Sequence, residues 1–181
     1  MVYIFLADGF EECEALAPAD ILRRADIEVK LTGVLGKTAT GSHGIKVECD
    51  IFPKSIDLKP NDVVVLPGGL PGTNYLKESP LVKETLLKAN KLGCKIAAIC
   101  AAPSVLGEMG LLKGKKATCF PGFEDKLTGA DFVNEKVVVD GNIITGCGAG
   151  AAFDFGFKLL EEIDGNALRS EKMKKGMLYK A

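Results

Sequence analysis

Apolar and amphipathic segments alternate along nearly the whole chain. The apolar runs are short and rich in Val, Ile and Ala, which is typical of strands buried inside a sheet. They predict strands over residues 2–7, 27–32, 45–51, 62–66, 95–99, 116–118, 136–139 and 143–145. The amphipathic segments repeat apolar side chains at helical spacing and predict helices over residues 14–25, 80–92, 152–163 and 167–175. This order predicts an α/β fold with a mostly parallel central sheet covered by helices on both faces.

One turn sequence changes the direction of the last strands. Asp140-Gly141-Asn142 separates them, and an Asp-Gly pair supplies the positive φ angles of a tight turn between antiparallel strands. We therefore expect a hairpin there. No repeat, linker or low-complexity segment interrupts the sequence, and 181 residues fit one domain covering residues 1–181.

Composition argues against several classes of function. The net charge is -1 and the lysines are spread along the chain, so a nucleic-acid partner is not expected. No apolar run reaches the roughly 20 residues of a membrane span, and the first strand lacks the basic flank of a secretion signal. The six cysteines form no CxxC pair and there is a single histidine, so neither a metal site nor a cofactor is expected. Free thiols without a secretion signal predict a cytoplasmic location.

The stretch KIAAICAAPSVLGEM, residues 95–109, carries the first candidate for chemistry. A strand runs into Cys100, and a helix begins near Pro103. A thiol at such a corner has the geometry of a nucleophile elbow, where backbone N–H groups and the helix dipole favour a thiolate. The residues leave a second interpretation open, because a free cysteine is often simply a small buried side chain.

Three loops that follow strands carry further chemistry. Residues 8–14 (DGFEECE) follow the first strand, residues 67–72 (PGGLPG) follow strand 62–66, and Cys100-Ala101 follows strand 95–99. Ligands of parallel sheets bind beyond the carboxyl ends of the strands, so we expect the three loops to meet. Together they would offer a carboxylate, glycine amides and a thiol, the groups that acyl-transfer or carbonyl chemistry requires.

The motifs ADGFEECEA, VVVLPGG and AAICAAPSVLGEMGLLKGKKAT resemble the ThiJ/PfpI superfamily, and in particular its Parkinsonism-associated protein deglycase branch. The resemblance runs from residue 1 to about residue 163, with the motifs in the family's order. It implies a flavodoxin-like three-layer sandwich of the class I glutamine amidotransferase type, a homodimer, and an oxidation-sensitive cysteine at the elbow. The activities that it implies are a glutathione-independent glyoxalase, deglycation of methylglyoxal adducts, and chaperone-like behaviour.

The resemblance also implies roles for individual residues. Cys100 matches the elbow cysteine, and Glu14 matches the carboxylate that contacts this thiol. Gly69 and Ala101 match the N–H positions of the oxyanion site, and Gly68 is grouped with them as a substrate-binding residue. A carboxyl group beside a developing thiolate keeps its proton, so the pKa of Glu14 should be raised. From the residues alone, Glu14 also fits an exposed acid in the first turn of a helix.

Two positions depart from the family pattern. The protease-like members carry a histidine directly after the nucleophile, and Ala101 in that place argues against a peptidase. The deglycase branch often carries a histidine in the loop after the elbow helix and the next strand, where this chain reads TCFPG (residues 118–122). Glu14, a water molecule or Cys119 would then have to act as the base.

Three more residues are candidates for the surroundings of the site. His43 falls where relatives often carry a basic residue on a loop that meets the partner subunit; the alternative is an exposed turn residue. Arg24 resembles a cation near the same pocket, or is a surface residue. Cys147 is a second redox thiol near Cys100 or a packed small side chain. The remaining cysteines, at positions 13, 49 and 94, are interpreted as structural.

Two functions of different classes follow from these residues. In the first, Cys100 attacks a small reactive aldehyde or an early adduct of one, amides hold the oxyanion, and Glu14 transfers protons. In the second, a low-pKa Cys100 is oxidised to a sulfinate, and the protein is an oxidation sensor or a redox-regulated chaperone. A role in thiazole monophosphate synthesis is not supported, because PGGLPG lacks the lysine of a phosphate-cradling loop.

Overall fold

A six-stranded sheet forms the centre of the computed structural model, which describes residues 1–180. Its strand order is β2-β1-β5-β6-β10-β9. Every neighbouring pair is parallel except β10 and β9, which form the predicted antiparallel hairpin. The strands of this sheet are β1 (Val2–Leu6), β2 (Val29–Gly33), β5 (Val63–Leu66), β6 (Lys95–Ile99), β9 (Val137–Asp140) and β10 (Ile143–Gly146).

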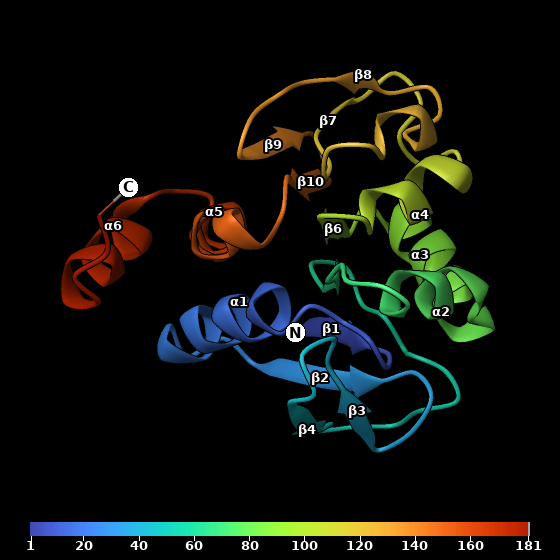
Figure 1. Ribbon diagram of the computed structural model, residues 1–181. Helices are drawn as coiled ribbons and strands as arrows, with labels where there is room; N and C mark the ends of the chain where they lie inside the picture. The colour runs from blue at the N-terminus through green and yellow to red at the C-terminus, as the bar shows by residue number, and fades with distance from the viewer. Residues whose placement is uncertain (181) are drawn as a thin grey trace.

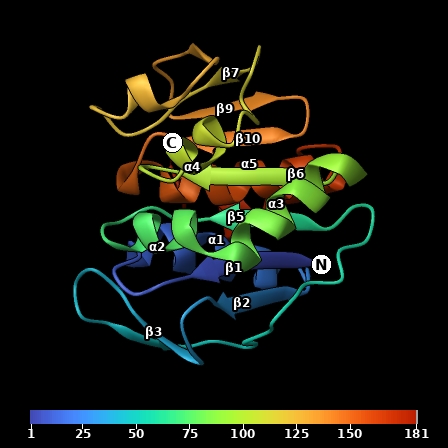
Figure 2. The same cartoon turned by 90° about the vertical axis from the view of Figure 1, so that its right-hand side faces the viewer.

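Helices cover both faces of the sheet, as Figures 1 and 2 show. One face carries α1 (Glu12–Arg24) and α5 (Ala152–Asp164), with α6 (Leu168–Gly176) packed on the outside of α5. The other face carries α2 (Gly72–Glu78), α3 (Pro80–Leu92) and α4 (Pro103–Glu108). This confirms the predicted three-layer α/β fold. Among residues 1–180, every helix is too short or too polar to cross a membrane.

Alternate side chains of the central strands belong to different halves of the core. Val63 and Val65 pack with the α1 and α5 side, whereas Val64 and Leu66 pack with the α3 side. Successive strand residues point to opposite faces, so a strand with helices on both sides must be apolar at every position. This explains why the strands read as continuous apolar runs.

Most predicted elements are present with small shifts at their ends. The helix α3 has the predicted bounds, and α1 begins two residues earlier than expected, at Glu12. The helix α2 was not predicted, and neither was β8, which has only two residues. The smaller elements are the ribbon β3 (Thr38–Thr40) and β4 (Lys46–Glu48), the pair β7 (Lys116–Ala117) and β8 (Asp131–Phe132), and 3₁₀ turns at Glu124–Lys126 and Ala149–Ala151.

The position of α1 is fixed by close packing against α5. A Cβ atom on Gly156 of α5 would lie 2.7 Å from Cδ1 of Ile21 and 3.0 Å from Cα of Pro18. Glycine is therefore required where the two helices approach. Because α1 also carries Glu14 in its first turn, this contact helps to set where that carboxyl group lies.

Candidate active site

Cys100 sits at a strained corner between β6 and α4. Its φ angle is 65°, a left-handed conformation that is uncommon for any residue other than glycine. The corner is held from two sides: the N–H of Cys100 donates to the carbonyl of Gly146 at 2.9 Å, and its carbonyl accepts the N–H of Phe120 at 2.9 Å. The side chain is partly exposed. This is the strand-to-helix corner geometry that the sequence predicts at Cys100.

Glu14 is fully buried beside this thiol. Its Oε2 atom accepts the N–H of Gly68 at 2.8 Å, while its buried Oε1 atom has no hydrogen-bond partner among residues 1–180 that meets ordinary geometry. Burial raises the pKa of Glu14 to about 7, although the N–H of Gly68 and the Cys100 thiol both act to lower it. The expected raised pKa is confirmed. Because Oε2 accepts the amide, the proton of the neutral form belongs on Oε1.

The glycine pair after β5 lies between the other two loops. A Cβ atom on Gly68 would lie 2.6 Å from Cβ of Cys100 and 2.8 Å from Oε2 of Glu14. Gly69 has a φ angle of 87°, and a Cβ atom there would lie 2.4 Å from the backbone nitrogen of Glu11. The three loops therefore meet as predicted, and the contact leaves no space for a side chain at either glycine.

The backbone N–H groups of Gly69 and Ala101 both act on the Cys100 thiol and lower its pKa. Burial acts more strongly in the opposite direction, and so does the charge of Glu14, so the pKa of Cys100 is raised to about 12. The expected low-pKa thiol is therefore wrong for the chain in this state. The helix α4 has only six residues, so its dipole does little against the loss of solvation.

Cys100 and Glu14 therefore titrate as one pair. The pair loses its first proton near neutral pH and holds the second until the solution is strongly alkaline. Two adjacent buried groups do not both become charged, because like charges repel. A thiolate at Cys100 can exist while the remaining proton stays on Glu14.

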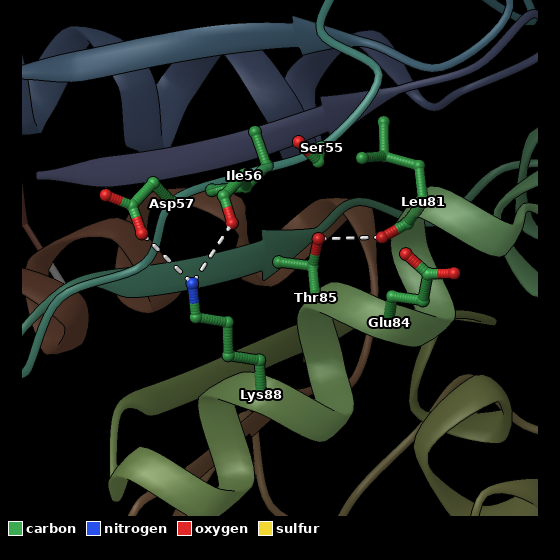
Figure 3. A pocket seen from close by; sticks show the side chains of 7 residues that line it. All are labelled: Ser55, Ile56, Asp57, Leu81, Glu84, Thr85 and Lys88. Carbon is green, nitrogen blue, oxygen red and sulfur yellow. Dashed lines mark hydrogen bonds and ion pairs between the residues drawn. The ribbon is translucent and has the colours of Figure 1, made fainter.

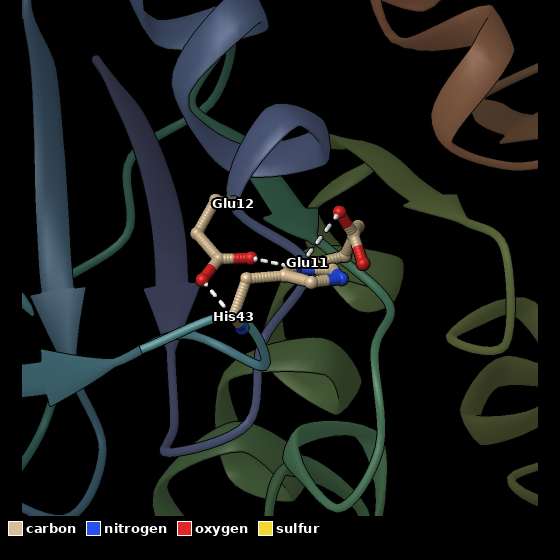
Figure 4. A group of neighbouring side chains, drawn as sticks. All are labelled: Glu11, Glu12 and His43. Carbon is tan, nitrogen blue, oxygen red and sulfur yellow. Dashed lines mark hydrogen bonds and ion pairs between the residues drawn. The ribbon is translucent and has the colours of Figure 1, made fainter. Parts of the chain in front are cut away.

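His43 lies beside Glu11 and Glu12 at the start of α1 (Figure 4). Its backbone N–H donates to Oε1 of Glu12 at 2.8 Å, and its Nδ1 atom lies 2.8 Å from Oε2 of the same carboxylate. Residues two apart on a helix point about 200° apart, so Glu12 and Glu14 face opposite sides. His43 is 68% exposed and does not reach Cys100 within the chain.

The pKa values of this ion pair move apart. Burial alone would raise the pKa of Glu12, but hydrogen bonds from the side chain of His43 and from backbone amides lower it to about 2. The hydrogen bond to Glu12 raises the pKa of His43, with a smaller contribution from the charge of Glu11. Ligand atoms of Glu11, Glu12 and His43 lie within 4.8 Å of one another, a set that could hold a metal ion. In the chain they instead bind one another.

Arg24 is not at the Cys100 thiol, and Cys13 does not have the buried position expected of it. Arg24 lies roughly 15 Å further along α1 than Glu14, and its Nε atom pairs with Asp20 at 2.7 Å. Cys13 is exposed, which contradicts its structural interpretation, and its Sγ atom lies 3.4 Å from Oε1 of Glu11. The other two cysteines interpreted as structural, Cys49 and Cys94, are buried.

Two cavities differ in how close they lie to the Cys100 elbow. The first, of about 310 Å³, lies beside α3, and none of the three site loops lines it (Figure 3). Two of its polar side chains are engaged within the chain: Nζ of Lys88 lies 3.2 Å from Asp57, and the hydroxyl of Thr85 donates to the carbonyl of Leu81. The one cation that lines this cavity, Lys88, is therefore already paired.

The second cavity, of about 640 Å³, adjoins the elbow. Cys119 and Cys147, both predicted near the site, line it together with Phe120. Sequence reasoning missed Phe132, which lies in the short strand β8 and also lines this cavity. The one sequence signal for this wall was the aromatic residue in TCFPG, residues 118–122.

Comparison with known proteins identifies the family. The model of the DJ-1/PfpI family matches residues 1–162. The chain belongs to this family. Similar proteins include Protein dj-1beta of Drosophila melanogaster, 40% identical over 178 residues that cover 97% of this chain and 95% of that protein. The glutathione-independent glyoxalase DJR-1.2 of Caenorhabditis elegans is 33% identical and covers 86% of this chain and 83% of that protein.

Solved structures of the DJ-1 superfamily share the fold. The crystal structure of Drosophila melanogaster DJ-1beta has a TM-score of 0.87 and 36% identity, covering 99% of this chain and 98% of that one. The oxidised DJ-1 of Toxoplasma gondii has a TM-score of 0.90 and 32% identity, with the same coverage. These matches confirm both the predicted family and the predicted flavodoxin-like fold.

Proposed function

We propose that this member of the DJ-1/PfpI family is a cysteine-dependent enzyme that acts on small reactive aldehydes or their early adducts. One observation carries the proposal: Cys100 stands at a positive-φ corner, its thiol acted on by the N–H groups of Gly69 and Ala101 and by the buried Glu14. These are a nucleophile, two oxyanion donors and an acid, the minimum for addition to a carbonyl.

The first step is the addition of Cys100 to the aldehyde. The thiolate forms a C–S bond to the aldehyde carbon, and the C=O π electrons move to oxygen. The amides of Gly69 and Ala101 hold this oxygen while Glu14 donates its proton to it, which gives a neutral hemithioacetal. The backbone donors are preorganised and need no reorientation as charge develops.

The second step applies to 2-oxoaldehydes such as methylglyoxal. The ionised Glu14 removes the proton from the carbon bonded to sulfur, and the proton is returned at the neighbouring carbon by way of an enediol. The product is a thioester of a 2-hydroxy acid, which water cleaves to regenerate the thiol. Oxidation of one carbon balances reduction of the other, so the sequence needs no external oxidant. A pKa of about 7 suits Glu14 to both acid and base work.

The comparisons support an enzyme without a glutathione requirement. The similar protein from Caenorhabditis elegans is named a glutathione-independent glyoxalase. A peptidase is not proposed, because Ala101 follows the nucleophile and the single histidine lies on the far side of α1 from it. We also propose that the protein acts as a homodimer, which sedimentation velocity tests directly: a monomer at micromolar concentration would contradict it.

Methylglyoxal turnover tests the reaction. Wild type should convert methylglyoxal to lactate, and Cys100→Ser should lose at least about 100-fold in kcat/KM, because a serine hydroxyl is a far weaker nucleophile without an adjacent base. The matched control is Cys94→Ser at the opposite end of β6, where Sγ lies 3.4 Å from the carbonyl of Lys59 and a serine hydroxyl can make the same contact, so turnover should stay at the wild-type value. Equal turnover in wild type and Cys100→Ser, or none in either, contradicts the proposal.

A second function uses the same groups. We propose that Cys100 is also oxidised by peroxide to a sulfinate, whose oxygens the amides of Gly69 and Ala101 would hold. A related DJ-1 from Toxoplasma gondii has been crystallised in an oxidised form. Limiting peroxide followed by intact-mass and peptide mapping should place two oxygen atoms on Cys100 before any other cysteine. Preferential oxidation of the exposed Cys13 would contradict this function.

A further inference from the structure

The cavity beside the elbow has the size of a ligand site. Its volume of about 640 Å³ falls within the range of small-molecule sites, about 300–1,000 Å³. Three segments form its walls: one after β7, one from β8 toward β9, and one after β10. The lining residues are Cys119, Phe120, Pro121, Glu124, Phe132, Asn134, Lys136, Cys147, Gly148, Ala149, Gly150 and Ala151.

The segments after β7 and after β10 are tied to the backbone of the nucleophile. The N–H of Phe120 donates to the carbonyl of Cys100, and the N–H of Cys100 donates to the carbonyl of Gly146, the residue directly before Cys147. Hydrogen bonds to the backbone of the elbow therefore anchor two of the segments that line the cavity. The cavity lies directly beside the elbow.

The walls are apolar, and their charged groups are engaged. Phe120 is 47% exposed and Phe132 is 40% exposed, although both are large aromatic side chains. Glu124 accepts the N–H of Gly122 at 2.7 Å, and Nζ of Lys136 lies 3.4 Å from Asp154. Exposed aromatic surface lining a concave site favours an uncharged apolar ligand, because covering this surface removes it from water.

Gly148 leaves space for the ring of Phe120 in the wall of the cavity. A Cβ atom on this residue would lie 3.1 Å from Cδ2 of Phe120, and its φ angle of 156° is one that other residues rarely adopt. The ring of Phe120 therefore rests against bare backbone. This side of the cavity therefore depends both on the ring of Phe120 and on the absence of a side chain at Gly148.

We propose that this cavity is the subsite for the apolar substituent of a 2-oxoaldehyde whose aldehyde carbon is attacked by Cys100. The inference rests on the proposed function and adds a substrate class to it. Aryl and branched-alkyl glyoxals bury their substituent between Phe120 and Phe132, whereas the single methyl group of methylglyoxal leaves most of the cavity unfilled. Phenylglyoxal should therefore have a kcat/KM at least about tenfold higher than methylglyoxal.

The ratio of the two specificity constants tests the subsite. In Phe132→Ala, the kcat/KM for phenylglyoxal divided by that for methylglyoxal should fall by about tenfold. The matched control is Phe52→Ala, which removes a ring that is 49% exposed and does not line the cavity. The control should keep the wild-type ratio. An unchanged ratio in Phe132→Ala, or a wild type that prefers methylglyoxal, overturns the proposal.

A binding measurement separates the subsite from the reaction. Acetophenone carries the phenyl ring and the carbonyl group but no aldehyde, so ligand-observed NMR can follow its binding to the Cys100→Ser protein. Binding should weaken at least about tenfold when Phe132→Ala is added. Turnover that depends on Cys100 with no effect of Phe132 overturns the subsite alone. Absence of turnover with Phe132-dependent acetophenone binding overturns the reaction and supports the apolar ligand site.

Discussion

Two glutamates on opposite sides of the first turn of α1 have pKa values that are shifted in opposite directions. Glu12 and Glu14 are two residues apart and both are buried. The pKa of Glu12 is lowered to about 2, where burial is outweighed by hydrogen bonds from His43 and backbone amides. The pKa of Glu14 is raised to about 7, because burial is opposed by only one amide and a neighbouring thiol.

Burial alone therefore does not decide the charge of a carboxyl group. Each hydrogen-bond donor and each cation that faces the group favours the ionised form, and their number decides whether the loss of solvation is overcome. On one side of α1 the carboxylate of Glu12 binds the loop that carries His43. On the other side the carboxyl group of Glu14 keeps its proton up to about neutral pH. Replacing each glutamate by glutamine, which cannot ionise, tests this difference.

The largest expected effect is on turnover. Glu14→Gln keeps the size of the side chain and the acceptor for the N–H of Gly68 but cannot transfer a proton. It should lower methylglyoxal kcat by about 100-fold or more, the usual contribution of a general acid or base. Glu12→Gln should stay within about twofold of wild type. Steady-state lactate formation measures both, and similar losses in the two variants would contradict the assigned roles.

The next effect is on stability as a function of pH. The pKa of Glu14 in the folded chain, about 7, lies above its ordinary value of 4.5. The stabilisation of the neutral form is therefore complete below pH 4.5 and is lost as the pH rises through 7. Relative to Glu14→Gln, wild type should lose about 3 kcal/mol of unfolding free energy between pH 4.5 and 8.5. Urea unfolding of both proteins measures this, and parallel pH profiles would contradict a raised pKa.

Gly68→Ala tests how closely the loops meet. The new methyl group would lie 2.6 Å from Cβ of Cys100 and 2.8 Å from Oε2 of Glu14, so one of these groups must move. We expect a loss of about 1–3 kcal/mol in unfolding free energy and a loss of at least about tenfold in kcat/KM. The control is Gly176→Ala, where a Cβ atom meets nothing within 4 Å. Equal behaviour of the two variants would show that the loops tolerate separation.

The smallest effect concerns the ion pair on the other side of α1. Because His43 is the single histidine, its ring proton gives one assignable NMR signal. Its pKa is raised by Glu12 and should fall back toward 6.5 in Glu12→Gln. In Glu14→Gln it should stay at the wild-type value, since Glu14 faces away from His43. A pH titration of this signal checks both variants.

Much of the fold could be predicted because the local pattern and the tertiary structure agree. Strand 62–66 reads as apolar throughout since helices bury both of its faces, and Asp140-Gly141 forms the turn that its sequence requires. The helix α2 was missed because it is short and begins at Pro71-Gly72, which in isolation indicates a turn. The strand β8 has two residues, too few to produce an alternating pattern.

The site was predictable as far as topology determines it. Loops at the carboxyl ends of β1, β5 and β6 had to meet, because these strands are parallel neighbours. The pKa of Cys100 was predicted in the wrong direction because a sequence shows an elbow but not how deeply it is buried. The contact of His43 with Glu12, and the approach of Phe132 to the cavity, depend on tertiary packing that leaves no periodic signal in the sequence.

The oxyanion donors of the elbow are main-chain N–H groups, and this has a consequence for evolution. Almost any codon change at Ala101 replaces a side chain and leaves the amide in place; only proline deletes it. The N–H group of Ala101 thus persists through most single substitutions, whereas a side chain at Gly69 would displace its loop, and Cys100 and Glu14 are each lost in a single step. In a related protein that has lost the reaction but kept the fold, we therefore expect substitutions at positions 14 and 100 to appear first.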